Sequence, residues 1–453
     1  MKHKALLLSI VVALMLAIAS RGSAPAAAQG AATMAPTASL MDPKDVALKA
    51  AGGKQLGGTV TILGVLGGAE QDQFLSIFKP FEEATGVKVE YEGTRDLNAI
   101  LQTRVDGGNA PDIVSSPSVG LMIDFAKAGK LIDLSQFLNT ATMNANYGQE
   151  LLKSVSIDGK LYSIFDAVNL GGLIWYNPKT YKGPNPPKSW DDLDSWAAKT
   201  AADGTTPWCI GLESGAASGW PGSNWIDQLI LLQAGPDKYE QWWQSKLPWS
   251  SPEVKHAFET YGKIATDSKM VNGGSTAALA LSFQNGADAM YAQPPACYLH
   301  LQASFMGGII NGNFPKLKPV EDIDFFPVPG FDASSDGVRL ISGEVMGMFN
   351  DTPQARALIS YFVSTEAQTL VAKTGNWMSA NKFVPVDAYP NPFTKRAAET
   401  LSSAKAVYYY GSSLMPSAMS DAFWKAVLRY VQQPDQLDSI LADLDKVQKD
   451  TYK

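Results

Sequence analysis

Residues 59–95 read as a strand, a helix and a second strand, and this unit constrains the fold more than any other segment. Val, Ile and Tyr mark the two strands, and one helix is predicted between them from a row of Phe and Leu side chains on one face. Glu70 and Arg95 follow the two strands. Ligands of open α/β sheets bind beyond the carboxyl ends of the strands, so these residues predict one wall of a polar binding site. The alternative is an ordinary unit with an exposed Glu and Arg.

Residues 1–28 have the pattern of a cleaved export signal. A basic start precedes an apolar core at 5–19, which is shorter than the roughly 20 residues that a membrane span needs. Small residues at 26–28 offer a cleavage site. Arg21 follows a run that resembles a lipidation signal, and no Cys occurs before position 209, so the sequence excludes a lipid anchor. We therefore expect an exported protein, in the periplasm or on the extracellular face of the membrane.

Residues 29–56 are rich in Ala, Gly, Pro and Ser, and they are predicted to be a flexible linker. From residue 57 onward roughly 400 residues remain, enough for two domains or more. Hydrophobic residues make up 45% of the chain, which suffices for two cores. The net charge of −7 is spread over both signs without a basic stripe, which argues against a nucleic-acid partner.

The sequence lacks the motifs of the common catalytic and metal sites. Only His256 and His300 remain beyond the signal segment, too far apart in sequence for a zinc motif. Nucleophile-elbow, phosphate-loop and dinucleotide-binding patterns are missing from it as well. We therefore expect no enzyme activity, metal or cofactor. A secreted carbohydrate-active enzyme with two facing carboxylates stays the enzyme alternative, because spacing alone selects no pair.

The chain also contains aromatic and acidic residues that belong to no catalytic or metal motif, and such residues are typical of a sugar site. Sugars pack their C–H faces on aromatic rings, and their hydroxyl groups need fixed polar partners. Trp220 and Trp377 stand beside Gly or Pro in predicted loops, which favours ligand contact over core packing. The two cysteines, Cys209 and Cys297, indicate one disulfide in an exported chain, with two buried free thiols as the alternative.

Several segments together resemble the family 1 extracellular solute-binding proteins, the receptors of ABC importers for sugars. The resemblance covers roughly residues 57–450. The segments are GTV at 58–60, FEEATGVKV at 81–89, APDI at 110–113, GKLY at 159–162, WYNP at 175–178 and PKSWDDL at 187–193.

Further segments are similar to the α-glucoside-binding branch of that family. They are GGAEQD at 67–72, YEGTRD at 91–96, PWCIGLESGA at 207–216, GWP at 219–221 and CYLH at 297–300. Both cysteines fall in these segments, which supports their pairing. Arg21 departs from the family, because many relatives carry a lipidated Cys there.

The resemblance implies an α/β, two-lobed periplasmic-binding-protein fold (type II-like) with a multi-crossing hinge. The first lobe is expected to hold 57–168 plus 330–375, and the second 172–325 plus 380–453. The chain would cross between them near 166–172, 325–332 and 375–380.

The resemblance also implies a monomeric binding protein that captures an oligosaccharide, an α-glucoside by this branch, and delivers it to an ABC membrane permease. A non-sugar solute is the remaining alternative. The candidate ligand-binding residues are Glu70, Arg95, Asp96, Ser116, Asn169, Trp220, Trp225, Tyr298, Glu344 and Trp377.

Overall fold

The predicted strand–helix–strand unit is present in the computed structural model, which describes residues 40–452. Strands β1 (Thr59–Gly64) and β2 (Lys88–Gly93) are parallel neighbours. The helix predicted between them is two helices, α2 (Ala69–Ser76) and α3 (Lys79–Thr85). β1 lies inside the sheet and is almost wholly buried, whereas the edge strand β2 exposes alternate residues. The reason is that β1 is covered on both faces of the sheet, whereas β2 is covered on one face only.

Six strands form the main sheet, in the order β11-β10-β3-β1-β2, with β6 paired to the other edge of β10. β10 runs antiparallel to both β3 and β6, and parallel to β11. Besides β1 and β2, this sheet contains β3 (Ile113–Ser116), β6 (Ser163–Leu170), β10 (Val338–Met348) and β11 (Ala406–Tyr409).

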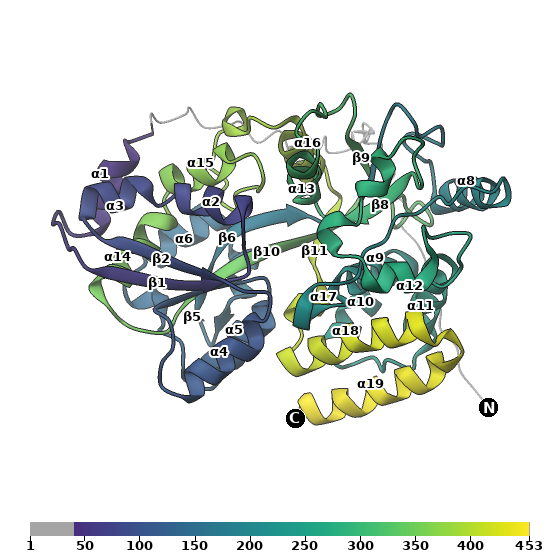
Figure 1. The fold of residues 1–453 in the computed structure, drawn as a ribbon. Helices are drawn as coiled ribbons and strands as arrows, with labels where there is room; N and C mark the ends of the chain where they lie inside the picture. The colour runs from purple at the N-terminus through teal and green to yellow at the C-terminus, as the bar shows by residue number, and fades with distance from the viewer. Residues whose placement is uncertain (1–39, 453) are drawn as a thin grey trace, which may run out of the picture. The chain divides into compact units, whose positions relative to one another are not determined.

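Strand β10 connects two large hydrophobic cores, because its Val345 lies in a first core and its Val338 in a second. Strand β6 pairs along β10 and leads from the first core, at Ile164, to a smaller third cluster, at Leu170. Figure 1 shows both strands running from the sheet on the left toward the helices on the right. A short antiparallel contact between Val168 and Met378 adds a further segment at this place.

Helices cover both cores. Around the first are α1 (Pro43–Ala50), α2, α3, α4 (Leu97–Asp106), α5 (Val119–Lys127), α6 (Thr140–Tyr147), α7 (Gln149–Lys153), α14 (Pro353–Phe362) and α15 (Thr365–Lys373). Around the second are α8 (Trp190–Ala202), α9 (Trp220–Ala234), α10 (Pro236–Trp243), α11 (Pro252–Ala265), α12 (Gly274–Ala280), α18 (Ser417–Gln432) and α19 (Leu437–Thr451).

A third, smaller cluster packs on one face of the sheet β8-β7-β9, and the second core packs on the other face. All four residues of its middle strand, β7, are buried. Its elements are β7 (Leu173–Tyr176), β8 (Leu299–Gln302), β9 (Asp324–Pro327), α13 (Met306–Asn313) and α16 (Pro392–Ser402). The lobe boundaries given above remain a prediction.

Helix α1 corrects part of the predicted linker. The Asp42 carboxylate accepts a hydrogen bond from the Lys44 N–H, and Pro43 occupies the first turn, so the helix has a standard N-terminal cap. Ala47 and Ala51 are buried in the first core. The Ala-rich composition that suggested a linker is equally the composition of a helix. The predicted export signal and residues 29–39 lie outside the described residues.

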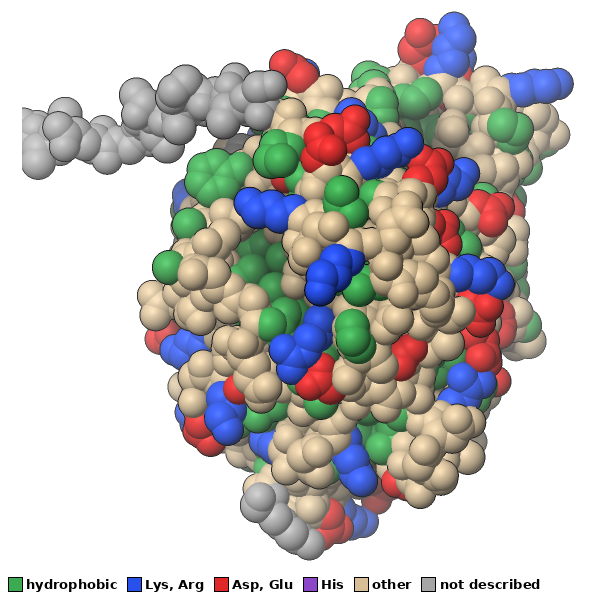
Figure 2. All heavy atoms as spheres, turned by 90° about the vertical axis from the view of Figure 1, so that its left-hand side faces the viewer, with side chains coloured by type: hydrophobic (Ala, Val, Ile, Leu, Met, Phe, Trp, Pro, Cys, Tyr) green, Lys and Arg blue, Asp and Glu red, His purple; other side chains and the backbone are tan. Residues whose placement is uncertain are grey.

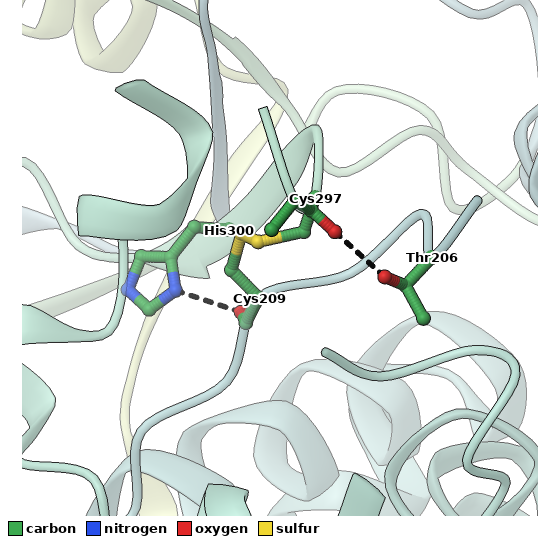
Figure 3. Close-up of a disulfide and its surroundings, with 5 residues drawn as sticks. Thr206, Cys209, Cys297 and His300 are labelled. Atoms are coloured by element: carbon green, nitrogen blue, oxygen red, sulfur yellow. Dashed lines mark hydrogen bonds between the residues drawn. A yellow bond between two sulfur atoms is a disulfide. The ribbon is translucent and has the colours of Figure 1, made fainter. Parts of the chain in front are cut away.

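The predicted disulfide is confirmed. Cys209 and Cys297 are bonded, with their Cα atoms 5.6 Å apart, within the usual range. Figure 3 shows His300 and Thr206 on either side of the bridge. The His300 ring donates from Nδ1 to the Cys209 carbonyl oxygen at 2.9 Å, and burial lowers the pKa of this imidazole to about 4. The Thr206 hydroxyl donates to the carbonyl oxygen of Ala296 at 2.6 Å.

The surface agrees with the absence of a basic stripe. On the face that Figure 2 shows, acidic and basic side chains are interspersed without a field of one sign. Among residues 40–452, no helix has both the length and the hydrophobicity required to cross a bilayer.

Removal of the disulfide is predicted to destabilise the fold. The bridge closes a loop of 88 positions, for which chain-entropy models give about 4–5 kcal/mol. The double variant Cys209→Ser/Cys297→Ser should therefore unfold at lower urea concentration than the oxidised protein, and a reducing agent should leave that variant unchanged. Two thiols titrated in the denatured, unreduced protein would contradict the pairing.

Candidate functional site: a cavity between the two cores

A cavity of about 740 Å³ lies between side chains of the first core and side chains of the second, a size typical of small-molecule sites. Seven of the ten predicted ligand-binding residues line this cavity: Glu70, Arg95, Asp96, Asn169, Trp220, Glu344 and Trp377. They come from strand ends, helix starts and the connecting strands.

Three predicted residues do not line the cavity. Ser116 is fully buried on β3, where its hydroxyl oxygen accepts a hydrogen bond from the N–H of Ser118, which does line it. Trp225 is 2% exposed and packs against Trp208 in the second core. It lies five residues after Trp220 on α9, so it points about 140° away around the helix. Tyr298 packs against Trp196 instead.

Glu70 and Arg95 meet because the loops after β1 and β2 pack closely. Gly93 allows this approach, since a Cβ atom there would lie 2.0 Å from the Leu66 carbonyl oxygen. The Arg95 Nη2 atom lies 3.6 Å from the Glu70 Oε2 atom. Burial raises the pKa of Glu70, and the positive charge of Arg95 opposes that rise. The pair can either bind a ligand or support the loops.

Arg95 and Asp96 also reach across the cavity. The Arg95 guanidinium lies over the Phe283 ring, 5.3 Å from its centre. The Asp96 carboxylate accepts a hydrogen bond of 3.2 Å from the backbone N–H of Ala216. Both contacts join residues that follow β2 to loops beside the second core, so they close one end of the cavity.

Glu344 belongs to a buried group of two carboxyls and one hydroxyl. Neighbouring strands β3, β10 and β6 contribute Ser115, Glu344 and Asp166 respectively. The Ser115 Oγ atom lies 2.7 Å from an Asp166 oxygen and 3.3 Å from a Glu344 oxygen. A bulge occurs here, because Ala167 pairs with Glu344 and Phe165 with the next residue, so that Asp166 is unpaired in the ladder.

The pKa values of both carboxyls are raised. Burial is the main cause for Asp166, which is 1% exposed. Burial is also the main cause for Glu344, and the negative charges of Asp166 and Glu70 raise its pKa further. Glu344 reaches the cavity, whereas Asp166 lies behind it.

Aromatic rings beside the second core form the opposite wall. Trp220 begins α9 and packs edge-to-face on Phe283, with ring centres 5.0 Å apart. Gly219 precedes it at φ 101°, and a Cβ atom there would lie 2.3 Å from the Trp424 carbonyl oxygen. Only glycine therefore allows α9 and α18 to approach so closely. Trp377 lines the cavity from the first core instead, where it is 3% exposed and packs edge-to-face against Phe74 of α2.

The sequence analysis missed one face of α18. Ser417, Asp421, Trp424 and Lys425 all line the cavity from this helix. They recur at intervals of three to four residues, the spacing of one helix face. The sequence did contain a signal for this face, namely a Trp that stands between an acidic and a basic residue at helical spacing. Recognising it as a binding face would have required knowing which side of α18 faces the cavity.

A second hollow of about 750 Å³ lies between α8 and α11. Its lining includes three acidic residues, Asp194, Glu259 and Asp267, together with Lys263, and Tyr430 supplies its one aromatic ring. It lacks the opposed polar and aromatic walls. Within residues 40–452, no three His, Cys, Asp or Glu side chains are placed to hold a metal ion.

Comparison with known proteins identifies the family. The family model described as bacterial extracellular solute-binding protein matches residues 67–369. The chain belongs to this family. The resemblance inferred from the sequence segments is thereby confirmed.

Two relatives align along most of the chain. The osmoprotective compounds-binding protein GgtB of Synechocystis sp. is 34% identical, and the match covers 83% of this chain and 89% of the relative. The alpha-glucosides-binding periplasmic protein AglE of Rhizobium meliloti is 32% identical, with 83% and 84% covered. Both names describe binding proteins rather than enzymes.

Solved structures confirm the predicted two-lobed α/β fold. A chitin oligosaccharide binding protein superposes with a TM-score of 0.75 at 20% identity, covering 87% of this chain and 98% of that one. RafE in complex with raffinose superposes with a TM-score of 0.65, also at 20% identity, covering 87% and 100%. At this identity the likeness concerns the fold alone.

Stability is predicted to fall as the pH rises from the ordinary pKa of a carboxyl, about 4, to the raised pKa of Glu344, about 8. The pair of carboxyls at Asp166 and Glu344 has raised pKa values, so within this range the folded protein keeps a proton that the unfolded chain has lost. The loss amounts to about 1.4 kcal/mol for each unit of pKa difference, and it is complete once the pH exceeds the raised values. Urea midpoints measured on both sides of this range should show a smaller fall for Glu344→Gln. Equal slopes for the two proteins would refute the assignment.

Proposed function

We propose that this protein is the extracytoplasmic receptor of an ABC importer and that it binds an oligosaccharide, a glucoside of two to a few units, in the cavity between its cores. The observation that carries the proposal is that two different walls face the same cavity: hydrogen-bonding side chains at Glu70, Arg95 and Glu344 lie opposite the rings of Trp220 and Trp424. Charge-assisted hydrogen bonds hold sugar hydroxyls, and rings pack on sugar C–H faces.

The names of relatives support this ligand class. AglE is named for α-glucosides, and several proteins with the same fold are described with bound or preferred sugars. GgtB is named for osmoprotective compounds, which favours a small polar solute as the second candidate.

Strand β10 supports a hinge mechanism. It is continuous between the two cores, so the cores can rotate about it while each keeps its own packing. A ligand that contacts both walls favours the closed arrangement by its differential affinity. The closed form would then dock on the membrane permease as a monomer. Export by the segment 1–28, followed by release into the periplasm or retention outside the membrane, belongs to the same proposal.

The Asp166–Glu344 pair does not suit the enzyme alternative. Both acids contact one hydroxyl, but only Glu344 lines the cavity, so the two cannot face a ligand as a pair of catalytic carboxylates. Recovery of the sugar after incubation tests the other acids of the cavity, Glu70, Asp96 and Asp421.

A screen of oligosaccharides by thermal shift tests the proposal. A sugar at 100 times its dissociation constant should stabilise the fold by roughly 2.7 kcal/mol. Chromatography after prolonged incubation should recover this sugar unchanged. Stabilisation by a non-sugar osmolyte alone would favour the second candidate, and cleavage of the sugar would favour the enzyme.

Substitutions on the two walls test which residues bind. Trp220→Ala and Glu344→Ala should each weaken affinity tenfold or more, about 1.4 kcal/mol, measured by calorimetric titration. Trp196→Ala is the matched control, since this half-buried ring packs on Tyr181 and Tyr298 away from the cavity. It should lower the melting temperature without changing affinity. Unchanged affinity in both wall variants would show that their side chains are structural.

A further inference from the structure

Two carboxyls meet at the Ser115 hydroxyl, which has one hydrogen to give, and this favours a proton on one of them. The Ser115 hydroxyl carries one hydrogen, yet its oxygen lies within hydrogen-bond reach of both Asp166 and Glu344. Ionised carboxylates only accept hydrogen bonds. With both acids ionised, one of the two contacts would have no hydrogen between its oxygens. A proton on one carboxyl group satisfies both contacts.

The distances indicate which acid holds this proton. The 2.7 Å contact to Asp166 has the length of a hydroxyl donating to a charged carboxylate. The 3.3 Å separation from Glu344 is longer than an ordinary O–H···O hydrogen bond, so the one Ser115 hydrogen goes to Asp166. Glu344 therefore receives little stabilisation of its charged form from this hydroxyl, and it is the acid that we expect to hold the proton.

Other groups around Glu344 favour the same state. Glu70 on α2 adds a negative charge, and Arg95 after β2 adds the one nearby positive charge, which its pairing with Glu70 largely offsets. Tyr91 on β2 and Tyr409 on β11 also face the group, and both phenols stay neutral because burial raises their pKa values. The Tyr409 hydroxyl donates to the Gly343 carbonyl oxygen rather than to Glu344.

We propose that Asp166, acting through Ser115, is a positioning residue that keeps Glu344 protonated on the cavity wall, so that the site presents a neutral carboxyl to an uncharged sugar. This inference rests on the proposed function for its ligand. The bulge at Asp166 is the structural device, because it places a buried carboxylate behind Glu344 without opening it to the cavity.

The direction of the pH effect follows from solvation. Loss of the Glu344 proton puts two negative charges on one hydroxyl, with Glu70 nearby. A neutral ligand that fills the cavity expels the water that screens these charges. The bound state therefore favours the protonated form, and by linkage the protonated form binds the ligand more tightly. Affinity falls as the pH rises, and binding above neutral pH takes up protons.

Calorimetric titration of the wild type with the best sugar of the screen tests this linkage. Affinity should fall from about pH 6 to about pH 9, by at most about tenfold per pH unit for one linked proton. Two buffers with different protonation enthalpies should report proton uptake. Asp166→Asn removes the negative charge behind Glu344 and should move the fall to lower pH.

Asp194→Asn is the matched control, because burial raises the pKa of this carboxyl too, at the second hollow. Its pH profile should equal that of the wild type. A flat wild-type profile without proton uptake, proton release on binding, or an unchanged profile in Asp166→Asn would overturn the proposal.

Infrared spectroscopy of the ligand-free protein separates this inference from the proposed function. A carbonyl band of a protonated carboxyl should appear at neutral pH, and it should be lost in Glu344→Gln and at high pH. Its absence would overturn the proton assignment without any ligand. If no sugar binds, the proposed function fails, and the infrared result still decides whether Glu344 holds the proton.

Discussion

The cavity depends on the pairing of β6 with β10. β10 runs from one large core to the other, β6 is hydrogen-bonded along it, and residues of both strands line the cavity. Their ladder is regular except at Asp166, where a bulge bends the strand and increases its twist. The bend comes just before β6 enters the smaller third cluster at Val168. The same irregularity brings Asp166 to Ser115 and Glu344, so one local departure from regular pairing sets both the path of the chain and the chemistry of the wall.

Two glycines impose a second constraint, one on each wall. Gly93 lets the loop after β1 approach the end of β2, which brings Glu70 and Arg95 together. Gly219 lets the start of α9 approach α18, which brings Trp220 beside Trp424. Any side chain at either position would collide with a backbone carbonyl. The polar wall and the aromatic wall are therefore each fixed by a close backbone approach.

Local patterns in the sequence predicted much of the fold and picked out several residues that line the cavity. Hydrophobic periodicity identified β1 and β2, and parallel pairing then required Glu70 and Arg95 to meet at one edge of the sheet. Composition misled at α1, because Ala-rich sequence describes helices as well as linkers. Trp225 was a wrong choice of helix face, since its environment depends on how α9 packs. Asp166 and Trp424 escaped prediction because their positions depend on a bulge and on the docking of α18, which no short window of sequence encodes.

Electrostatics separates the roles of the acids at the cavity. Glu70 lies beside Arg95, which balances its negative charge. Both side chains line the cavity, so a bound ligand can hydrogen-bond to them. Glu344 has a carboxylate behind it instead of a cation, and burial disfavours a second charge there. Two glutamates on one wall thus offer different partners to a neutral ligand: a charge-balanced acceptor at one place and a neutral carboxyl at the other. Because a cavity with two uncompensated charges would resist the loss of water on closure, this division makes closure over an uncharged solute less costly.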